Sequence, residues 1–514
     1  MDTLQSVPNL SFTDLTNMQY LVPELVIVIM MFVLIVLDLL LPKSVHRSII
    51  GWLTVAALIT AAGFVVRDLG WGASEPITFI RNTYRIDDFA NLFKIIFLSS
   101  AALIVFMSLG SVSDEEIPQQ AEMYYLFLPA TLGAMVVASS GDLITLFIGL
   151  ELMSVTTYIL VGIRKSRMQS TEGAFKYVVL SGISSAFLLY GMSFLYGMTG
   201  TTDLALLRQG LMAGFEQFDL LIYISFFLML VGIAFKIAAA PFHTWAADVY
   251  QGAPIPVAAF LAVVSKGAGI ALLYRLIYNV FYGVGSEAVL FHDDVFLALS
   301  VLAAAAMIFG NTLALRQRNT KRLLAFSGIA NSGYLLVPIS LPFTIVHFDV
   351  FSEGMYYLIA YALMNIGAFA VITAVNKASG HEELSGFAGL YYRAPSTALA
   401  MVALVLSLAG LPLTGGFMGK LYILLGTMST HQYWLGAVMI LTSVISYYYY
   451  FGIIRQMFMR SGPEAVLIMA MPLRLTIWFC AAGSVILGFF PGRIIDGIRQ
   501  LFSISSDLLF KIST

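Results

Sequence analysis

Apolar stretches of about 20 residues follow one another from Leu21 to Phe490, separated by short polar loops. A helix needs about 20 apolar residues to cross the hydrocarbon core of a bilayer. The strands of a membrane β-barrel are shorter and alternate in polarity, which this chain does not. We therefore predict an all-α polytopic membrane protein of about fourteen transmembrane helices, at 21–41, 48–67, 88–110, 123–139, 141–163, 172–198, 219–242, 254–281, 294–315, 322–341, 353–375, 396–427, 432–459 and 471–490.

Composition supports this prediction and excludes other classes. Of 514 residues, 59% are hydrophobic and 11% are charged, where soluble proteins have about 45–50% and about 25%. The 27 basic and 29 acidic residues nearly balance, which excludes a strongly basic nucleic-acid binder. The only cysteine, Cys480, cannot form an internal disulfide, a cysteine zinc site or an iron–sulfur ligand set. We expect no metal and no cofactor on this chain, and a first apolar helix that is retained.

Basic residues in the loops predict the orientation of the chain. Fourteen of the 27 basic residues lie in loops after odd-numbered segments, seven in the other loops and the C-terminal tail, and six within segments. Cytoplasmic loops usually carry the positive excess. We therefore predict that the odd-numbered loops face the cytoplasm and that both termini face outward.

The six basic residues within segments differ in depth. A charge at the bilayer centre costs about 2.5–3.5 kcal/mol on insertion scales, whereas a residue near a segment end can extend its charge to the interface. Lys94, Arg275 and Lys176 are close enough to segment ends for this simple explanation, although function stays open for them. The deeper residues, for which we expect a function, are Lys236, Lys266 and Lys420.

Glu151 lies near the middle of the fifth segment, within GDLITLFIGLELMSVTTYIL. A buried glutamate can be neutral and merely structural. A buried lysine nearby would stabilise the negative charge of Glu151, and Glu151 would stabilise the positive charge of that lysine. The local sequence does not establish that they meet.

Proline interrupts the seventh and twelfth segments, each beside a lysine. Pro241 follows Lys236 by five residues, and Pro412 precedes Lys420 by eight. Proline frees backbone hydrogen-bonding groups, which membranes tolerate where protein or water satisfies them. Broken helices in corresponding places of two halves indicate a transporter built from repeats. We predict inverted five-helix repeats in segments 4–8 and 9–13, and the divisions 1–122, 123–281, 282–460 and 461–514.

Three further features are open to more than one interpretation. His243 lies seven residues after Lys236, and a relay of protons and a structural contact at the break are equally good explanations of it. Lys176 is a second possible relay. The tyrosine run 447–450 is interpreted as packing or interface material.

Four stretches resemble the antiporter-like subunits of respiratory complex I and of multi-subunit cation/proton antiporters. They are PFHTWAADVYQGAPIPVAAFLAVVSK (241–266), AFKYVVLSGISSAFLLYGMSFLYGMTGTT (174–202), KRLLAFSGIANSGYLL (321–336) and LSLAGLPLTGGFMGKLYIL (406–424). The resemblance covers nearly the whole chain. Length, the number of segments and the lysine in GGFMGK are most similar to the N-type members, whereas M-type members usually carry an acid there.

The resemblance implies a role for each matching position. Glu151 and Lys236 would be the acid–lysine pair of the first half-channel, Lys266 the central relay, and Lys420 the terminal lysine of the second half-channel. One position departs from the family, which commonly has histidine where this chain has Asn331. Asparagine does not titrate, so a relay there needs water or other side chains.

The resemblance also implies a setting. The chain would be a proton-translocating subunit of NADH:quinone oxidoreductase in a bacterial cell membrane, beside M-, K- and J-type subunits. FMN, iron–sulfur clusters and quinone would be bound by other subunits. A sodium/proton antiporter subunit of the same superfamily is the alternative. A purely structural scaffold is a third, but it has no need of four ionisable residues at mid-membrane depth.

Overall fold

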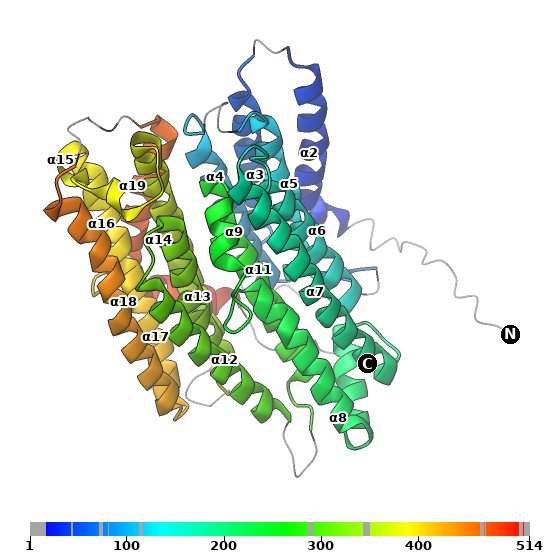
Figure 1. Cartoon of the computed structure of the whole chain (residues 1–514). Coiled ribbons are helices and arrows are strands. Elements are labelled where there is room, and N and C mark those ends of the chain that lie inside the picture. The colour runs from blue at the N-terminus through cyan, green and yellow to red at the C-terminus, as the bar shows by residue number, and fades with distance from the viewer. Residues whose placement is uncertain are drawn as a thin grey trace.

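The computed structural model describes residues 17–42, 45–70, 76–80, 82–112, 117–285, 291–342, 350–462, 467, 469–502 and 507. Helices make up nearly all of it (Figure 1). This confirms the prediction of a helical membrane protein.

The N-terminal part contains three long helices and a small hairpin. Its elements are η1 (Met18–Leu21), α2 (Val22–Leu40), α3 (Ser48–Arg67), β1 (Ile77–Phe79), β2 (Tyr84–Ile86) and α4 (Asp88–Ser108). Asp87 starts α4 by accepting a hydrogen bond of 2.8 Å from the backbone N–H of Ala90. The two strands pair antiparallel, with Ile77 opposite Ile86, and the sequence analysis did not predict them.

The next part runs from the fourth predicted segment to the eighth. Its elements are α5 (Gln120–Ala138), α6 (Leu143–Val161), α7 (Met168–Thr199), α8 (Leu204–Lys236), α9 (Ala246–Gly252), α10 (Ile255–Phe260), η2 (Leu261–Ser265), α11 (Lys266–Leu276) and η3 (Ile277–Phe281). The last four form one continuous helical stretch that is wholly buried. Its two η segments are π-helical turns.

The remaining part contains the second broken helix. Its elements are α12 (Phe291–Ala314), α13 (Thr320–Ile339), α14 (Val350–Ser379), η4 (Leu384–Phe387), α15 (Leu390–Arg393), α16 (Pro395–Ala409), α17 (Gly415–Ser429), α18 (Tyr433–Met459), α19 (Met471–Phe489) and α20 (Pro491–Leu501). The amphipathic α20, also not predicted, packs Ile495 against Tyr356 of α14 and Leu487 of α19.

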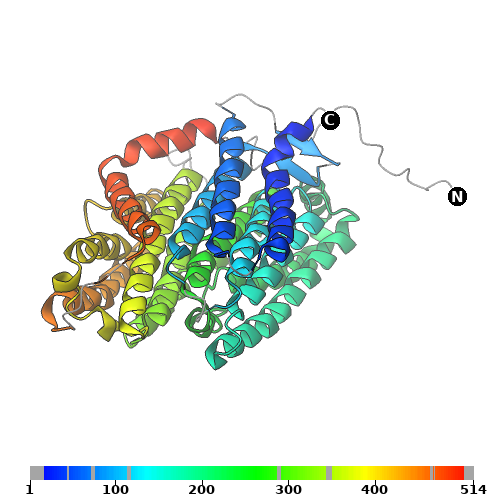
Figure 2. The same cartoon turned by 90° about the horizontal axis from the view of Figure 1, so that it is seen from above.

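The long helices form one bundle, with α5–α8 toward one side, α16–α18 toward the other, and α11 near the middle (Figure 1). Seen from above, α2 and α3 flank the bundle and α20 runs along its edge (Figure 2). Small residues allow close packing, as in α12 and α13: a Cβ at Gly310 would lie 2.4 Å from the backbone N of Ala330.

By length and composition, twelve of the described helical segments can cross a membrane. Two of the predicted fourteen are not among them. The tenth corresponds to α13, whose Ser327, Asn331 and Ser332 lower its hydropathy. The twelfth is divided into α16 and α17, because the chain breaks after Ala409 and resumes its helix at Gly415. The count of fourteen crossings therefore stays a prediction.

Candidate functional site

Four ionisable residues come from four helices of the bundle. They are Glu151 on α6, Lys236 at the end of α8, Lys266 at the start of α11 and Lys420 on α17. The three lysines are 4%, 3% and 8% exposed, and Glu151 is half-buried. Because charges in an apolar interior are costly, each of these side chains needs polar partners.

A serine links Lys236 of α8 to α6, the helix that carries Glu151. The Nζ of Lys236 donates a hydrogen bond of 2.9 Å to the Oγ of Ser154, which lies one turn after Glu151 on α6. Glu151 accepts a bond of 2.5 Å from Ser185 of α7. The two charges interact electrostatically, but within the described residues they form no direct ion pair. Lys236 is therefore hydrogen-bonded to the turn of α6 that follows Glu151, and its charge interacts with that of the acid.

The backbone freed by the break after Lys236 is satisfied by side chains. The carbonyl of Ile237 accepts a bond of 2.7 Å from Ser332 of α13. The carbonyl of Phe235 accepts one of 3.1 Å from the indole of Trp245. Protein groups thus replace the helical bonds that α8 loses before α9 begins.

The two possible relay residues have contacts other than Glu151 and Lys236. His243 stacks on Phe309, with 6.2 Å between ring centroids, and its buried Nδ1 has no hydrogen-bond partner among the described residues. Lys176 is partly exposed and lies 2.7 Å from both Glu172 and Asp248, and Asp248 also pairs with Arg322. For Lys176 this is the arrangement expected of a charge at the interface.

Lys266 is held between α13 and α14. Its Nζ donates to the backbone carbonyl of Gly328 and lies 3.4 Å from the hydroxyl of Tyr361. The ammonium also lies 5.5 Å from the ring centroid of Tyr361. The described residues around Lys266 provide no carboxylate in ion-pair contact with it. Its charge is therefore stabilised by dipoles and a ring.

Lys420 uses the second broken helix. Its Nζ lies 3.1 Å from the carbonyl of Leu408 and 3.3 Å from that of Ala409, the last residues of α16. It also lies 4.5 Å from the ring centroid of Tyr334. Carbonyls at a helix C-terminus carry partial negative charge and favour a cation. The break thus supplies the groups that bind the lysine, which explains why the two occur together.

Polar side chains occupy the region between these two lysines. Asn331 accepts a bond of 2.6 Å from the hydroxyl of Tyr357 and donates one of 2.9 Å to the carbonyl of Ser327. The hydroxyl of Ser327 is hydrogen-bonded to that of Tyr450. Tyr450 is thus part of a polar network, and its interpretation as packing or interface material was incomplete. The signal for it in the sequence was the number of tyrosines in apolar helices.

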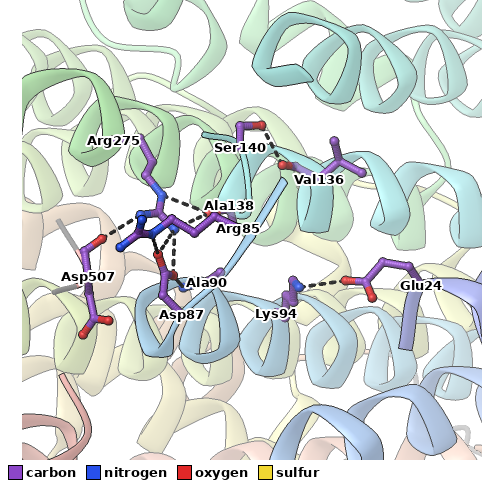
Figure 3. A network of polar contacts seen from close by, with 10 residues as sticks. All are labelled: Glu24, Arg85, Asp87, Ala90, Lys94, Val136, Ala138, Ser140, Arg275 and Asp507. Carbon is purple, nitrogen blue, oxygen red and sulfur yellow. Dashed lines mark hydrogen bonds and ion pairs between the residues drawn. The ribbon is translucent and has the colours of Figure 1, made fainter. Parts of the chain in front are cut away.

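Two basic residues contradict the sequence interpretation (Figure 3). Lys94 and Arg275 are buried instead of extending to the interface. Lys94 forms an ion pair of 2.7 Å with Glu24, and Arg275 forms one of 2.7 Å with Asp87. The sequence did not reveal these partners because each lies on a different element of the chain.

Among the described residues, no group of three or more His, Cys, Asp or Glu is placed to hold a metal ion. A helical membrane protein with interrupted helices at buried lysines has the architecture of a secondary transporter or a proton pump. This is the class that the fold and the site define.

Comparison with known proteins defines the family. Residues 140–446 match the family model described as NADH:quinone oxidoreductase/Mrp antiporter, TM. A NADH-quinone oxidoreductase subunit N of a Paenibacillus species is 52% identical over 508 residues, covering 96% of this chain and 98% of the relative. The subunit N of Brevibacillus brevis is 48% identical over 95% of this chain and 96% of the relative. The chain belongs to the NADH:quinone oxidoreductase/Mrp antiporter family and, within it, to the subunit N group.

Solved structures agree with this assignment. A chain of respiratory complex I from Thermus thermophilus with bound aureothin has a TM-score of 0.76 and 29% identity, and the match covers 93% of this chain and 99% of that one. A chain of the archaeal membrane-bound sulfane sulfur reductase has a TM-score of 0.84 at 24% identity, covering 95% and 97%. The second likeness shows the fold alone.

Proposed function

We propose that this chain is a proton-translocating membrane-arm subunit of NADH:quinone oxidoreductase. The observation that carries the proposal is the series of buried ionisable residues, in a chain whose relatives are named subunit N. Electron transfer from NADH to quinone takes place on other subunits and drives the movement of protons here. The complex is a translocase, and this chain contributes no redox centre.

Coupling begins at the first acid and lysine. A carboxylate stabilises a nearby ammonium group, so a change in the separation of Glu151 and Lys236 changes how tightly Lys236 holds its proton. Ser154, one turn after Glu151 on α6, is hydrogen-bonded to Lys236 and so links the lysine to the helix of the acid. A proton released there passes to Lys266 and then to Lys420. Each charge moved across the membrane works against about 2.3 kcal/mol per 100 mV.

The step from Lys266 to Lys420 passes a position where the resemblance expects histidine and this chain has Asn331. Hydroxyl groups both donate and accept hydrogen bonds, so they can pass a proton along a chain. Asn331 accepts a hydrogen bond from the hydroxyl of Tyr357 and donates one of 3.4 Å to the hydroxyl of Ser327. We assign Asn331 the role of orienting these hydroxyls, which with water replace the titrating ring.

The proposed topology is fourteen crossings with two inverted repeats of five helices. The presence of a break and a buried lysine at α8–α9 and again at α16–α17 supports it. The repeats correspond to 123–281 and 282–460, preceded by a three-helix part and followed by the last helix. The protein lies in the cell membrane of a bacterium with both termini outside.

Cysteines placed at Ser166 and Ser506, with Cys480 replaced by serine, should be labelled from opposite sides of the membrane. The basic residues Arg164 to Arg167 predict a cytoplasmic Ser166, and an even number of crossings from an outer N-terminus predicts an outer Ser506. Ser506 lies outside the described residues. Labelling with an impermeant maleimide in vesicles of known orientation is the measurement. Labelling of both positions from one side would refute fourteen crossings.

Gly328→Ala should lower proton pumping about tenfold, less than the roughly hundredfold loss in rate that a displacement of about 1 Å at a reacting group can cause, because the shift here is smaller. A Cβ at Gly328 would lie 3.1 Å from the Nζ of Lys266 and 3.2 Å from the Tyr361 hydroxyl, closer than ordinary van der Waals contact, so both groups would have to shift. The measurement is proton uptake into vesicles per assembled complex. Gly182→Ala is the matched control, because a Cβ there meets nothing within 4 Å. Equal pumping by both variants would contradict the placement of Lys266 against Gly328.

The partners and the alternative function are tested together. We propose M-, K- and J-type subunits as neighbours, with FMN, iron–sulfur clusters and quinone on other chains of the complex. Purification of the intact complex, identification of its subunits, and NADH-driven proton uptake in sodium-free medium test this. Co-purification with cation/proton antiporter subunits alone, and transport that needs a sodium gradient, would favour the alternative.

A further inference from the structure

Arg275 is the largest fully buried side chain in the described part of the chain, and four groups bind it (Figure 3). Its guanidinium lies 2.7 Å from both carboxylate oxygens of Asp87, 3.0 Å from the carbonyl of Ala138 and 2.7 Å from the carbonyl of Asp507. It also lies 4.3 Å from the ring centroid of Phe89. These groups belong to the start of α4, the end of α5 and the segment after α20. Arg275 therefore joins three parts of the bundle to its own helix.

Asp87 is equally constrained. It caps α4 through the backbone N–H of Ala90 and forms an ion pair of 3.0 Å with Arg85 of β2. It also lines a cavity of about 450 Å³ that Asp68, Asp88 and other residues share. A carboxylate that makes this many bonds has little freedom to move, so it is a fixed anchor for Arg275.

The helix that Arg275 belongs to is the one that carries Lys266. Lys266 is the first residue of α11 and Arg275 lies nine residues later, near its end. A π-helical turn precedes α11 and another follows it. Such turns interrupt the regular α-helical hydrogen bonds and are frequent at functional sites. Between these turns, α11 is fixed to neighbouring elements by side-chain contacts near both of its ends. Lys266 makes these contacts at the start of the helix, and Arg275 makes them near its end.

We propose that the Arg275–Asp87 pair is a positioning unit for Lys266. It fixes the end of α11 opposite the lysine, and so sets the place of the ammonium group between Gly328 and Tyr361. The planar guanidinium suits this role because its nitrogens bind different partners in fixed directions. Its Nη2 contacts both carboxylate oxygens of Asp87, and its Nε and Nη1 donate to the carbonyls of Ala138 and Asp507. This inference rests on the proposed function for its link to pumping, but the position of residue 266 is measurable without it.

The first test measures protons taken up per electron transferred by the assembled complex. Arg275→Gln and Asp87→Asn should each lower this ratio about tenfold, because a shift of about 1 Å at a reacting group can cost about a hundredfold in rate. The double variant should have the same ratio of protons to electrons as either single variant, since each single substitution already breaks the Arg275–Asp87 ion pair. A wild-type ratio in assembled Arg275→Gln, or losses that multiply in the double variant, would overturn the proposal.

The second test follows the position of residue 266 directly. With Cys480 replaced by serine, Lys266→Cys provides a single thiol whose rate of labelling by a small permeant reagent reports its surroundings. Adding Arg275→Gln should change that rate severalfold, because the displaced thiol has different surroundings, and should leave the rate at Lys420→Cys unchanged. This readout does not require pumping, so it separates failure of this inference from failure of the proposed function. Equal labelling at residue 266 with and without Arg275 would refute the positioning role.

Another buried ion pair in the same region provides the matched control (Figure 3). Lys94 and Glu24 are buried at 2.7 Å from each other, and the Tyr84 hydroxyl donates a bond of 2.6 Å to Glu24. Burial and the Glu24 carboxylate raise the pKa of Tyr84 above its ordinary value, so it stays a donor. This pair joins α2 to α4 and does not touch α11. The double variant Lys94→Met with Glu24→Gln should keep the wild-type ratio of protons to electrons. A loss equal to that of the Arg275 variant would mean that breaking any buried ion pair lowers this ratio, and would contradict a specific role for Arg275.

Discussion

Replacement of Lys236 by alanine should lower proton pumping by about a hundredfold per assembled complex, the lower end of what a positioned proton-transferring side chain contributes to a rate. The lysine is buried and its ammonium is bound by Ser154. No neighbour in the described structure replaces it as a titrating base at that place. Lys236→Arg should fail as well, because arginine keeps the charge but does not release its proton. Lys236→Ala removes both the positive charge and the group that titrates, whereas Lys236→Arg removes only the group that titrates.

Glu151→Ala should have an effect of similar size, since it removes the carboxylate that interacts with Lys236. Glu151→Asp keeps the charge and should retain more activity than Glu151→Ala. Its shorter side chain weakens the bond from Ser185, so activity should stay below that of the wild type.

These variants are compared by proton uptake into vesicles, normalised to the assembled complex. Lys94→Ala is unsuitable as a control because Lys94 is buried and paired with Glu24. Lys165→Ala, in an exposed loop, takes its place. Wild-type pumping by assembled Lys236→Ala would refute this lysine as a proton carrier.

Lys420→Ala is the second variant with a large expected effect, again about a hundredfold, because the terminal step loses its carrier. The substitution also leaves the carbonyls of Leu408 and Ala409 without their cation at the end of α16. Some loss of stability is therefore expected, and pumping has to be compared at equal amounts of assembled complex.

Lys420→Arg provides the sharper form of this experiment. Arginine can still bind those carbonyls and face the ring of Tyr334, so the fold should be kept. It cannot release a proton at physiological pH. Near-normal pumping by Lys420→Arg would mean that the site needs a positive charge and that no proton passes through residue 420.

The positions of the helices were largely predictable from the sequence. The segment predicted at 48–67 is α3 with the same bounds, and 141–163 corresponds to α6 at Leu143–Val161. The apolar length needed to cross a bilayer is a local property of the chain. The hairpin of Ile77–Phe79 and Tyr84–Ile86 and the amphipathic helix Pro491–Leu501 were missed, since strands of three residues and half-polar helices lack that apolar length.

The candidate site was predictable only in part. Lys236, Lys266 and Lys420 were identified because a lysine deep in an apolar segment is costly wherever its partners lie. The partners of these lysines were not predictable from the sequence. The serine beside Lys236, the carbonyl of Gly328 and the end of α16 are set by how separate helices pack.

By itself the sequence determined that the chain is a helical membrane protein, where its helices run, and which charges need an explanation. These follow from the hydropathy of about 20 neighbouring residues and from the cost of a charge in lipid. Only the tertiary structure decided that Arg275 and Lys94 are buried. Asp87 lies 188 residues from Arg275 along the chain, and no local pattern tells whether such partners meet. A charged side chain stays inside the protein only where a partner lies within hydrogen-bonding distance, because that partner replaces the water that the charge has lost.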